Sequence, residues 1–347
     1  MAPEIRRSLV QHSSLRQDPH AVLRRVLDRV RPGTDPDAPT RELEQRIADL
    51  LGKPAALFFP TGTMAQQTAL RVHAERTGRR TFAAHPRCHL AVWEEEGYSA
   101  VHGLRHKAVG DRHELITLDD LAEVREPLAA LLLELPQRDL GGLLPTWDDL
   151  VAQTTWARDR GAAAHLDGAR LWEAQTGYER PFAEIAGLFD TVYVSLYKGL
   201  EGVRGAVLAG DRETVDAASV WRHRLGGAIP DSWPAAVTAL MGLDEVLPRM
   251  AEFRDHARAV AAAINADGYA RTRPEVPQTP LFHIDIPASK DAVAAASKRI
   301  LEETGVELPR RPGTSPDPTR CTIEVTIGVV SLDFTPQEVA DLIRQLR

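Results

Sequence analysis

The chain has 347 residues, of which 43% are hydrophobic and 26% charged, and its formal net charge is −7. This length exceeds one typical domain and suggests two, and the composition is sufficient for a large core. An acidic chain without a long basic run argues against a nucleic-acid surface, and the absence of an apolar run of about 18 residues argues against a membrane span.

The cysteines and the first residues indicate the compartment and exclude some metal sites. Cys88 and Cys321 are the only cysteines, which excludes a disulfide framework and fits a reducing cytosol. They form no Cys/His cluster with zinc spacing, so we expect no metal site. Residues 1–11 have no apolar segment, so we expect no signal peptide and a cytoplasmic protein.

The N-terminal part of the chain predicts two helices. Residues 18–31 have apolar side chains at helical spacing. A turn-rich segment follows at residues 31–39, and we expect Thr40 to cap a second helix that ends before Gly52.

Between residues 55 and 209, strand-like and helical patterns alternate. The expected strands cover residues 55–59, 80–84, 100–102, 129–134, 162–166, 191–196 and 206–209, and the expected helices include residues 64–74 and 150–160. Such alternation is typical of a wound α/β sheet with helices on both faces.

The C-terminal part has a different pattern. A long helical stretch at residues 234–267 contains Pro248, which we expect to kink or divide it. A strand, a helix, a strand and a helix then follow, at residues 282–286, 290–304, 322–327 and 336–347, with a proline-rich loop at residues 309–318. We therefore expect an N-terminal helical segment (1–40), a large domain (41–247) and a small C-terminal domain (248–347).

Two apolar runs lead to side chains suited to catalysis. The first ends at Asp167, the second covers residues 191–196 and leads to Lys198, and a glycine follows each of these side chains. Short apolar runs of this kind are typical of buried parallel strands, which deliver their last side chains to a cleft. A lysine that binds pyridoxal phosphate (PLP) covalently, and an aspartate that keeps its pyridine nitrogen protonated, would fit this pattern. A structural ion pair beside a turn is the alternative.

A turn after the first strand of this region suits phosphate. The strand-like run 55–59 is followed by Thr61-Gly62-Thr63 and then by a helical pattern. Free backbone N–H groups and the positive end of the helix dipole make such a turn a phosphate cradle. An ordinary capped helix is the alternative.

Three further side chains suit a flat ring and a carboxylate. His89 offers an imidazole that can stack on a pyridine ring and exchange protons near neutral pH. Arg170, shortly after Asp167, and Arg320, before an apolar run, carry guanidinium groups, which match the geometry of a carboxylate. A surface histidine and solvated arginines at strand ends are the alternatives.

The order of these motifs resembles the threonine aldolase and β-eliminating lyase family of PLP-dependent enzymes. The matching pieces are Thr61-Gly62-Thr63, His89 before an aromatic-Glu pair, His165-Leu166-Asp167-Gly168-Ala169-Arg170 and Lys198-Gly199-Leu200. The resemblance spans roughly residues 40–345. It implies an α/β fold of the PLP-dependent transferase type (fold type I), with a mostly parallel sheet in the large PLP-binding domain and a small C-terminal α+β domain.

The resemblance also implies roles at the cofactor. Lys198 would hold PLP, Asp167 would face the pyridine nitrogen, and His89 would stack on the ring. Gly62 and Thr63 would bind the phosphate.

At the substrate, the resemblance implies that Arg170 and Arg320 hold the carboxylate, with Arg170 also at the cofactor. Gln137 falls where the family has a histidine against the substrate β-hydroxyl, and an amide there can donate a hydrogen bond but cannot take the proton. Residues 221–227 resemble the segment that reaches a neighbouring subunit's cofactor, so a homodimer or homotetramer is expected.

Two further departures concern the substrate side of the site. The family's N-terminal Ser-Asp-Thr segment is not recognisable in residues 1–20, and Ala228-Ile229-Pro230 lacks the arginine often found after the glycine run. The cofactor motifs therefore match the family more closely than the substrate motifs do.

These observations together predict a cytosolic PLP-dependent lyase that cleaves a β-hydroxy-α-amino acid to glycine and an aldehyde, with His89 or water as the base. One alternative is β-elimination or other carbanion chemistry on a β-substituted amino acid, with Lys198 as the base. Another is a weakly catalytic PLP-binding sensor or partner protein. In each case the expected partner is a small amino acid, with no nucleic acid and no membrane.

Overall fold

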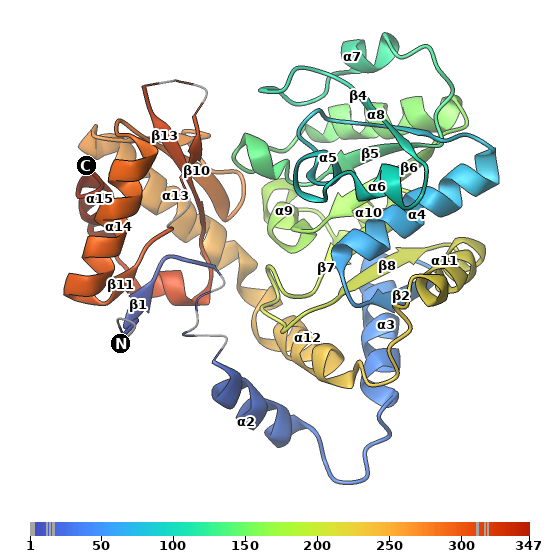
Figure 1. Cartoon of the computed structure of the whole chain (residues 1–347), viewed down its shortest axis with the longest axis horizontal. Coiled ribbons are helices and arrows are strands. Elements are labelled where there is room, and N and C mark those ends of the chain that lie inside the picture. The colour runs from blue at the N-terminus through green and yellow to red at the C-terminus, as the bar shows by residue number, and fades with distance from the viewer. Residues whose placement is uncertain are drawn as a thin grey trace.

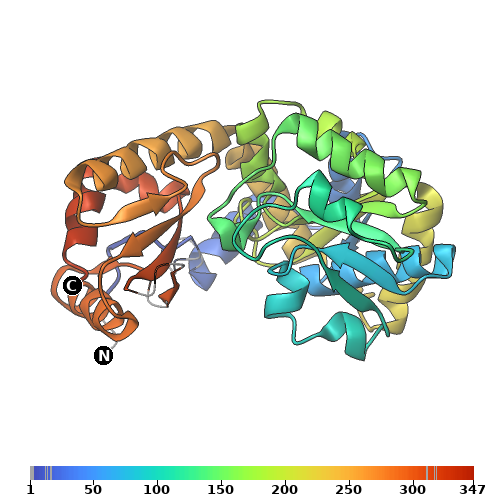
Figure 2. The same cartoon turned by 90° about the horizontal axis from the view of Figure 1, so that it is seen from above.

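The computed structural model describes residues 4–11, 13, 15, 18–309, 312–315, 317 and 319–347. The chain forms a larger and a smaller lobe (Figure 1), and the view from above separates the two lobes (Figure 2). The larger lobe contains a seven-stranded sheet and the smaller a four-stranded one. In the part of the chain that the structure describes, no helix combines the length and the apolar character needed to cross a membrane.

The large sheet is mostly parallel. In sheet order its strands are β2 (Ala55–Phe59), β8 (Ala206–Gly210), β7 (Thr191–Ser195), β6 (Ala163–Gly168), β5 (Ala130–Glu134), β3 (Thr81–Ala84) and β4 (Arg105–Ala108). Strand β8 is antiparallel to both of its neighbours, and the other pairs of adjacent strands are parallel. The carboxyl ends of the parallel strands, and that of β2, therefore lie at one edge of the sheet.

Helices cover both faces of this sheet, because its central strands are apolar on both sides. One face packs on α3 (Ala38–Leu51), α8 (Trp147–Asp159), α9 (Leu171–Tyr178) and α10 (Phe182–Gly187). The other packs on α4 (Gly62–Thr77), α5 (His89–Trp93), α6 (Gly97–Ala100) and α11 (Arg212–Arg224). Outside these layers lie α2 (Pro19–Arg29) and α12 (Trp233–Glu245), which pack together, and α7 (Leu118–Ala122).

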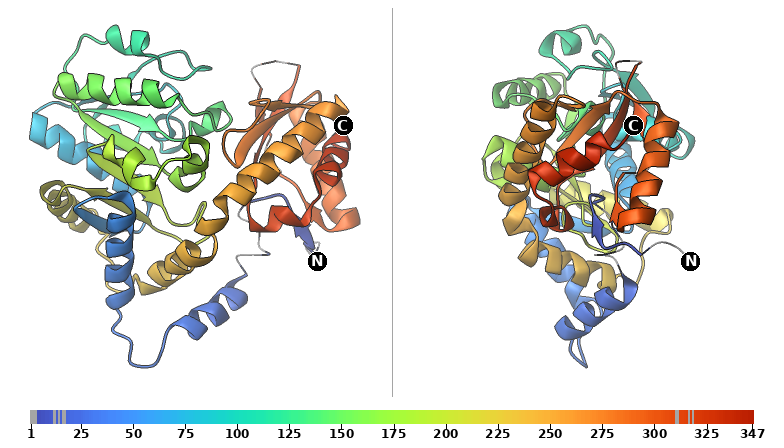
Figure 3. Two further views of the ribbon diagram at one scale, coloured as in Figure 1. Left: turned by 180° about the vertical axis from the view of Figure 1, so that it is seen from behind. Right: turned by 90° about the vertical axis from the view of Figure 1, so that its left-hand side faces the viewer.

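The smaller lobe is an antiparallel sheet with helices, and it includes the first residues of the chain. Its sheet order is β12 (Gly313–Thr314), β13 (Cys321–Thr326), β10 (Leu281–Ile286) and β9 (Arg271–Arg273). The lobe also contains α13 (Met250–Asp267), α14 (Lys290–Thr304), α15 (Pro336–Arg344) and the short helix η3 (Val329–Asp333). Strand β1 (Arg7–Ser8) pairs in parallel with β11 (Val306–Glu307), and Figure 3 shows the N-terminal segment beside the C-terminal helices.

The expected fold class, a mostly parallel α/β sheet followed by a smaller α+β lobe, is confirmed. The stretch around Pro248 divides as predicted, with the short helix η2 (Leu247–Arg249) between α12 and α13. Part of the expected 309–318 loop, residues 310, 311, 316 and 318, lies outside the described residues.

Two local predictions were wrong. Helix α3 begins at Ala38 with Asp37 at its cap position, so Thr40 lies inside the helix, because Pro39 suits the first helical turn. Residues 100–102 form the end of a short helix and a turn, and the strand is β4, further along the chain. Strand β4 is an edge strand with polar, partly exposed side chains, so it lacks the apolar run that marks the buried strands.

Candidate active site

The candidate catalytic residues lie at the carboxyl edge of the large sheet, where ligands bind in open α/β sheets. Each follows or ends a different strand: Gly62 and Thr63 follow β2, His89 follows β3, Asp167 and Arg170 lie at the end of β6, and Lys198 follows β7. Because β6 and β7 are adjacent and parallel, the predicted neighbourhood of Asp167 and Lys198 is formed by the sheet itself.

A cavity of about 340 Å³ opens at this edge, between the two lobes. His89, Arg170 and Lys198 line it. From the smaller lobe, Glu324 and Thr326 complete the wall. Residues that are far apart in the sequence, from both lobes, therefore line the cavity together.

Lys198 is buried at the wall of this cavity. Burial, followed by the charge of Arg170, lowers the pKa of its ammonium group to about 8, while Asp167 acts in the opposite direction. A lysine with this pKa has an appreciable neutral fraction near neutral pH, which a nucleophile or a base requires.

Asp167 is fully buried and has a fixed orientation. Its Oδ2 accepts a hydrogen bond from Gln66 Nε2 at 2.9 Å, and its Oδ1 accepts one from the Ala169 N–H at 3.1 Å. Burial raises the pKa of Asp167, whereas Lys198 and these two donors favour the ionised form. A carboxylate held by these two donors would accept a hydrogen bond from a protonated ring nitrogen, and the positive charge of that nitrogen would stabilise the ionised form of Asp167.

Gly62 marks a close approach of the backbone to the sheet. It begins α4, whose cap residue Thr61 accepts a hydrogen bond from Met64 N at 3.2 Å. A Cβ atom at Gly62 would lie 2.0 Å from the Oη atom of the buried Tyr193, so only glycine fits. The first turn of α4, with Gly62 and the exposed Thr63, leaves backbone N–H groups available for an anion.

His89 lies half-buried in the cavity wall, with its Nε2 3.9 Å from Glu94 Oε1. Burial, followed by the charges of Lys198 and Arg138, lowers its pKa to about 3. The ring is therefore neutral at physiological pH, which suits stacking on a cofactor and makes the imidazole a weak base.

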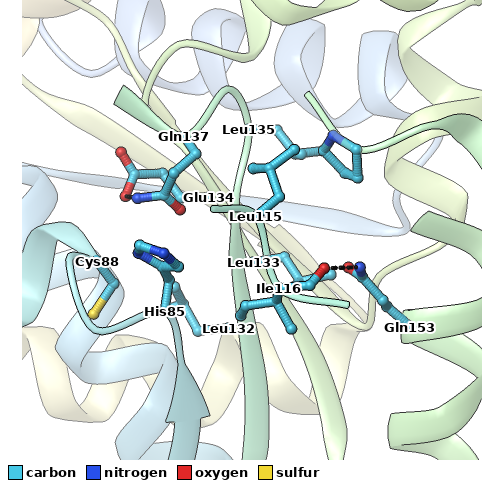
Figure 4. A pocket seen from close by; sticks show the side chains of 11 residues that line it. His85, Cys88, Leu115, Ile116, Leu132, Leu133, Glu134, Leu135, Gln137 and Gln153 are labelled. Carbon is cyan, nitrogen blue, oxygen red and sulfur yellow. Dashed lines mark hydrogen bonds between the residues drawn. The ribbon is translucent and has the colours of Figure 1, made fainter. Parts of the chain in front are cut away.

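The structure does not bring Gln137 into this cavity. Gln137 is buried beside a second, small cavity, and its Nε2 donates to Glu134 Oε2 and to the Arg87 carbonyl, both at 3.2 Å. Figure 4 shows the Gln137 and Glu134 side chains together, above His85. The amide of Gln137 therefore turns toward Glu134 at the end of β5 and away from the cavity that Lys198 lines.

Arg320 also lies away from the cavity. Its Nη1 donates to the Asp285 carbonyl at 3.2 Å, and its Nε lies 3.3 Å from Asp317 Oδ2. It precedes β13, about 13 Å along the strand from Glu324, which does line the cavity. Arg320 is therefore not among the residues that line the cavity.

The sequence reasoning missed several residues that line the cavity. Arg138 directly follows Gln137, and its Nε donates to Glu324 Oε2 at 2.6 Å. Residues 9–11 reach the cavity from the N-terminal strand, although no family motif marks them. A charged residue inside the apolar run 321–327 was the one available signal for Glu324.

These residues fit PLP. A phosphate can approach the free backbone N–H groups in the first turn of α4, and Lys198 faces the cavity with a lowered pKa. Asp167 offers a buried carboxylate held by two neutral donors. The fold and the site together define a PLP-dependent enzyme of fold type I.

The comparison with protein families identifies the group within this class. The model of the beta-eliminating lyase family matches residues 31–287, which is most of the chain. The chain belongs to this family, as the sequence motifs indicated.

Curated relatives carry aldolase names. Low-specificity L-threonine aldolase 1 of Arabidopsis thaliana is 29% identical over 80% of this chain and 80% of its own length. Aldolase vrtJ of Penicillium aethiopicum is 30% identical over 78% of this chain and 70% of its own length.

Two solved structures are closely similar to this chain in fold. A protein from Exiguobacterium sp. 255-15, assigned as an aromatic amino acid beta-eliminating lyase/threonine aldolase, has a TM-score of 0.91 and 34% identity, covering 99% of this chain and 97% of the other. A protein from Listeria monocytogenes, assigned as an L-allo-threonine aldolase, has a TM-score of 0.90 and 34% identity, covering 99% and 96%.

Proposed function

We propose that this PLP-dependent lyase cleaves a β-hydroxy-α-amino acid to glycine and an aldehyde. The observation that carries the proposal is that Asp167 lies at the end of β6 and Lys198 follows the adjacent parallel strand β7, with Lys198 and Arg170 lining one cavity. The aldolase names of the relatives support the same reaction class. We further propose that the enzyme acts in the cytosol.

The residues have distinct roles in this proposal. Bound PLP supplies a ring that accepts the electron pair left on Cα when the Cα–Cβ bond breaks. Lys198 holds the cofactor covalently, and Asp167 keeps a proton on the ring nitrogen. Gly62 and Thr63 hold the phosphate through the first turn of α4.

Arg170 binds the α-carboxylate of the substrate. This contact orients the substrate and so selects which bond to Cα would be perpendicular to the ring plane of bound PLP. His89 stacks on the ring, and His89 or a water beside it accepts the β-hydroxyl proton. Because the pKa of His89 is lowered to about 3, this base is weak, and we expect slow cleavage of threonine.

A product panel tests the proposal. Purified holoenzyme is incubated with threonine, allo-threonine and phenylserine, and glycine, aldehyde, keto acid and ammonia are measured separately. Glycine and aldehyde in equal amounts are expected, with none from the Lys198→Ala variant. Keto acid and ammonia without aldehyde would contradict aldol cleavage.

One observation favours β-elimination as a second candidate. The pKa of Lys198, lowered to about 8, gives this amine a useful neutral fraction for removing an α-proton once it is freed from the cofactor. In that case O-acetylserine or cysteine would yield keto acid and ammonia in the same panel.

We also propose that the active unit is at least a dimer. Residues 221–227 lie beside the start of α4: Arg222 Nη1 donates to the Phe58 carbonyl at 2.7 Å, and a Cβ at Gly227 would lie 2.3 Å from Met64 Sδ. The matching segment of the family reaches a neighbouring cofactor, and symmetric dimers are the commonest assembly. Light scattering that shows a fully active monomer would contradict this proposal.

A further inference from the structure

Glu324 enters the active-site cavity from the smaller lobe and faces two arginines of the larger lobe. Its Oε2 accepts from Arg138 Nε at 2.6 Å, and its Oε1 lies 3.4 Å from Arg170 Nη2. All three side chains line the cavity together with Lys198. A protein carboxylate therefore already occupies part of the region to which a substrate carboxylate must bind.

Glu324 carries its negative charge at neutral pH. Although burial raises its pKa, the neighbouring His283, whose Nε2 lies 3.8 Å from Glu324 Oε2, and the charges of Arg170 and Arg138 hold that pKa well below its usual range. Arg138 is itself fixed, since its guanidinium also lies over the Trp93 ring at 5.0 Å. The cluster is therefore a fixed set of two cations and one anion.

Other titratable residues near the cavity contribute little to the net charge of the cluster that Arg138, Arg170 and Glu324 form. His89 is neutral, because its pKa is about 3, and Lys198 is committed to the cofactor. Asp167, which is not among the lining residues, would pair with the protonated ring nitrogen of bound PLP. Two arginines and one glutamate therefore leave room for one further negative charge, which the α-carboxylate of an amino acid supplies.

We infer that Glu324 determines the substrate class, restricting it to amino acids without an acidic side chain. A second carboxylate on the substrate would lie beside Glu324 without a cation to balance it, and such a charge is costly in a partly buried site. The inference rests on the proposed function in one respect, that the α-carboxylate binds at Arg170.

Equilibrium binding tests this inference without requiring catalysis. L-Alanine and L-aspartate differ by one carboxylate at Cβ, and neither has a β-hydroxyl group to cleave. Their dissociation constants are measured on the holoenzyme from the change in cofactor absorbance and from the change in tryptophan fluorescence. The readout is the ratio of the Kd for aspartate to the Kd for alanine.

For the wild type we expect this ratio to be at least about ten, which means that alanine binds more tightly than aspartate. This is the effect expected of two like charges in a partly solvated site. Glu324→Gln should lower the ratio about tenfold, mainly through tighter binding of aspartate. Glu324→Asp, which keeps the charge, should retain the wild-type ratio. Glu302→Gln, at an exposed glutamate of α14 in the same lobe, is the matched control and should change nothing.

A second variant gives an independent reading if Glu324→Gln folds poorly. Arg138→Gln removes one cation, so the ratio should rise above that of the wild type. A wild type that binds both amino acids equally, or a Glu324→Gln variant that weakens both to the same degree, would overturn the inference.

These outcomes are separable from those of the proposed reaction. Selective binding of alanine without cleavage of any β-hydroxy amino acid would overturn the reaction and support the inference. Cleavage with an unchanged ratio in Glu324→Gln would overturn only the inference.

Discussion

Glu134 and Asp167 stand directly opposite each other in the register of the parallel strands β5 and β6. Neighbouring carboxyl groups at this depth cannot both ionise at low cost. Gln66 and the Ala169 N–H favour the ionised form of Asp167. Burial and then the charge of Asp167 raise the pKa of Glu134 to about 8, so Glu134 is the member of the pair that holds a proton at neutral pH.

Glu134→Gln should change the pH dependence of stability. A carboxyl group with a raised pKa in the folded state contributes stability at low pH, which is lost as pH rises from its ordinary pKa, near 4.3, through the folded value of about 8. At pH 9 the variant should be more stable than the wild type by on the order of 1 kcal/mol, with the difference shrinking toward pH 5. Urea unfolding of the apoprotein at several pH values measures this, and a difference independent of pH would contradict it.

Lys198→Ala should abolish the covalent cofactor chromophore. Borohydride reduction of the wild type should fix the cofactor to a peptide that contains Lys198, detected by mass spectrometry. Because the pKa of this amine is about 8, the rate of cofactor attachment to the apoprotein should rise between pH 7 and pH 9. A variant that retains the reduced adduct would show that another lysine holds the cofactor.

Asp167→Ala should lower turnover by about 10²–10³-fold or more, because it removes a preorganised charge from the ring nitrogen. Asp167→Asn keeps the shape but removes the charge and replaces one acceptor oxygen with an NH2 group, so it should lose nearly as much turnover. Single-turnover kinetics on fully loaded protein separates this effect from weaker cofactor binding. Near-normal turnover in either variant would refute the role.

Gly62→Ala should weaken cofactor binding, because the new methyl group would collide with Tyr193 Oη. The double variant Gly62→Ala with Tyr193→Phe removes the nearest clashing atom, leaving the ring Cζ at 2.6 Å, and should recover part of the affinity. Fluorescence titration of the apoproteins with PLP compares the variants, with Tyr193→Phe alone as control. Equal affinity in the wild type and Gly62→Ala would show that the phosphate binds elsewhere.

Gln137→His should not increase threonine cleavage. The side chain at position 137 lies in the small cavity with Glu134, so an imidazole there would not reach the substrate hydroxyl. The values of kcat/KM for threonine should agree within about 3-fold in the wild type and the variant, far from the 10²–10⁴-fold that a positioned base supplies. A gain of tenfold or more would place residue 137 at the substrate.

The sequence alone determined the cofactor half of the site. The positions of Asp167 and Lys198 were predictable because each ends or follows a short apolar run typical of a buried strand, and parallel strands deliver such residues to one edge. Gly62 was predictable because a strand, a tight turn and a helix start form a phosphate cradle. The division near residue 247, which stays a proposal, falls at η2 for a local reason, since Pro248 interrupts the helix.

Only the tertiary structure decided the substrate half. Gln137 and Arg138 are adjacent in sequence, yet the first turns toward Glu134 and the second into the active-site cavity. Arg320 and Glu324 are close in sequence, yet only Glu324 lies at the cavity. Gln137 and Arg138 point in different directions although they are adjacent, and Arg320 lies about 13 Å along the strand from Glu324. The packing of the smaller lobe on the larger one fixes which side chains line the cavity. That packing depends on contacts between residues far apart in the chain, which no local pattern records.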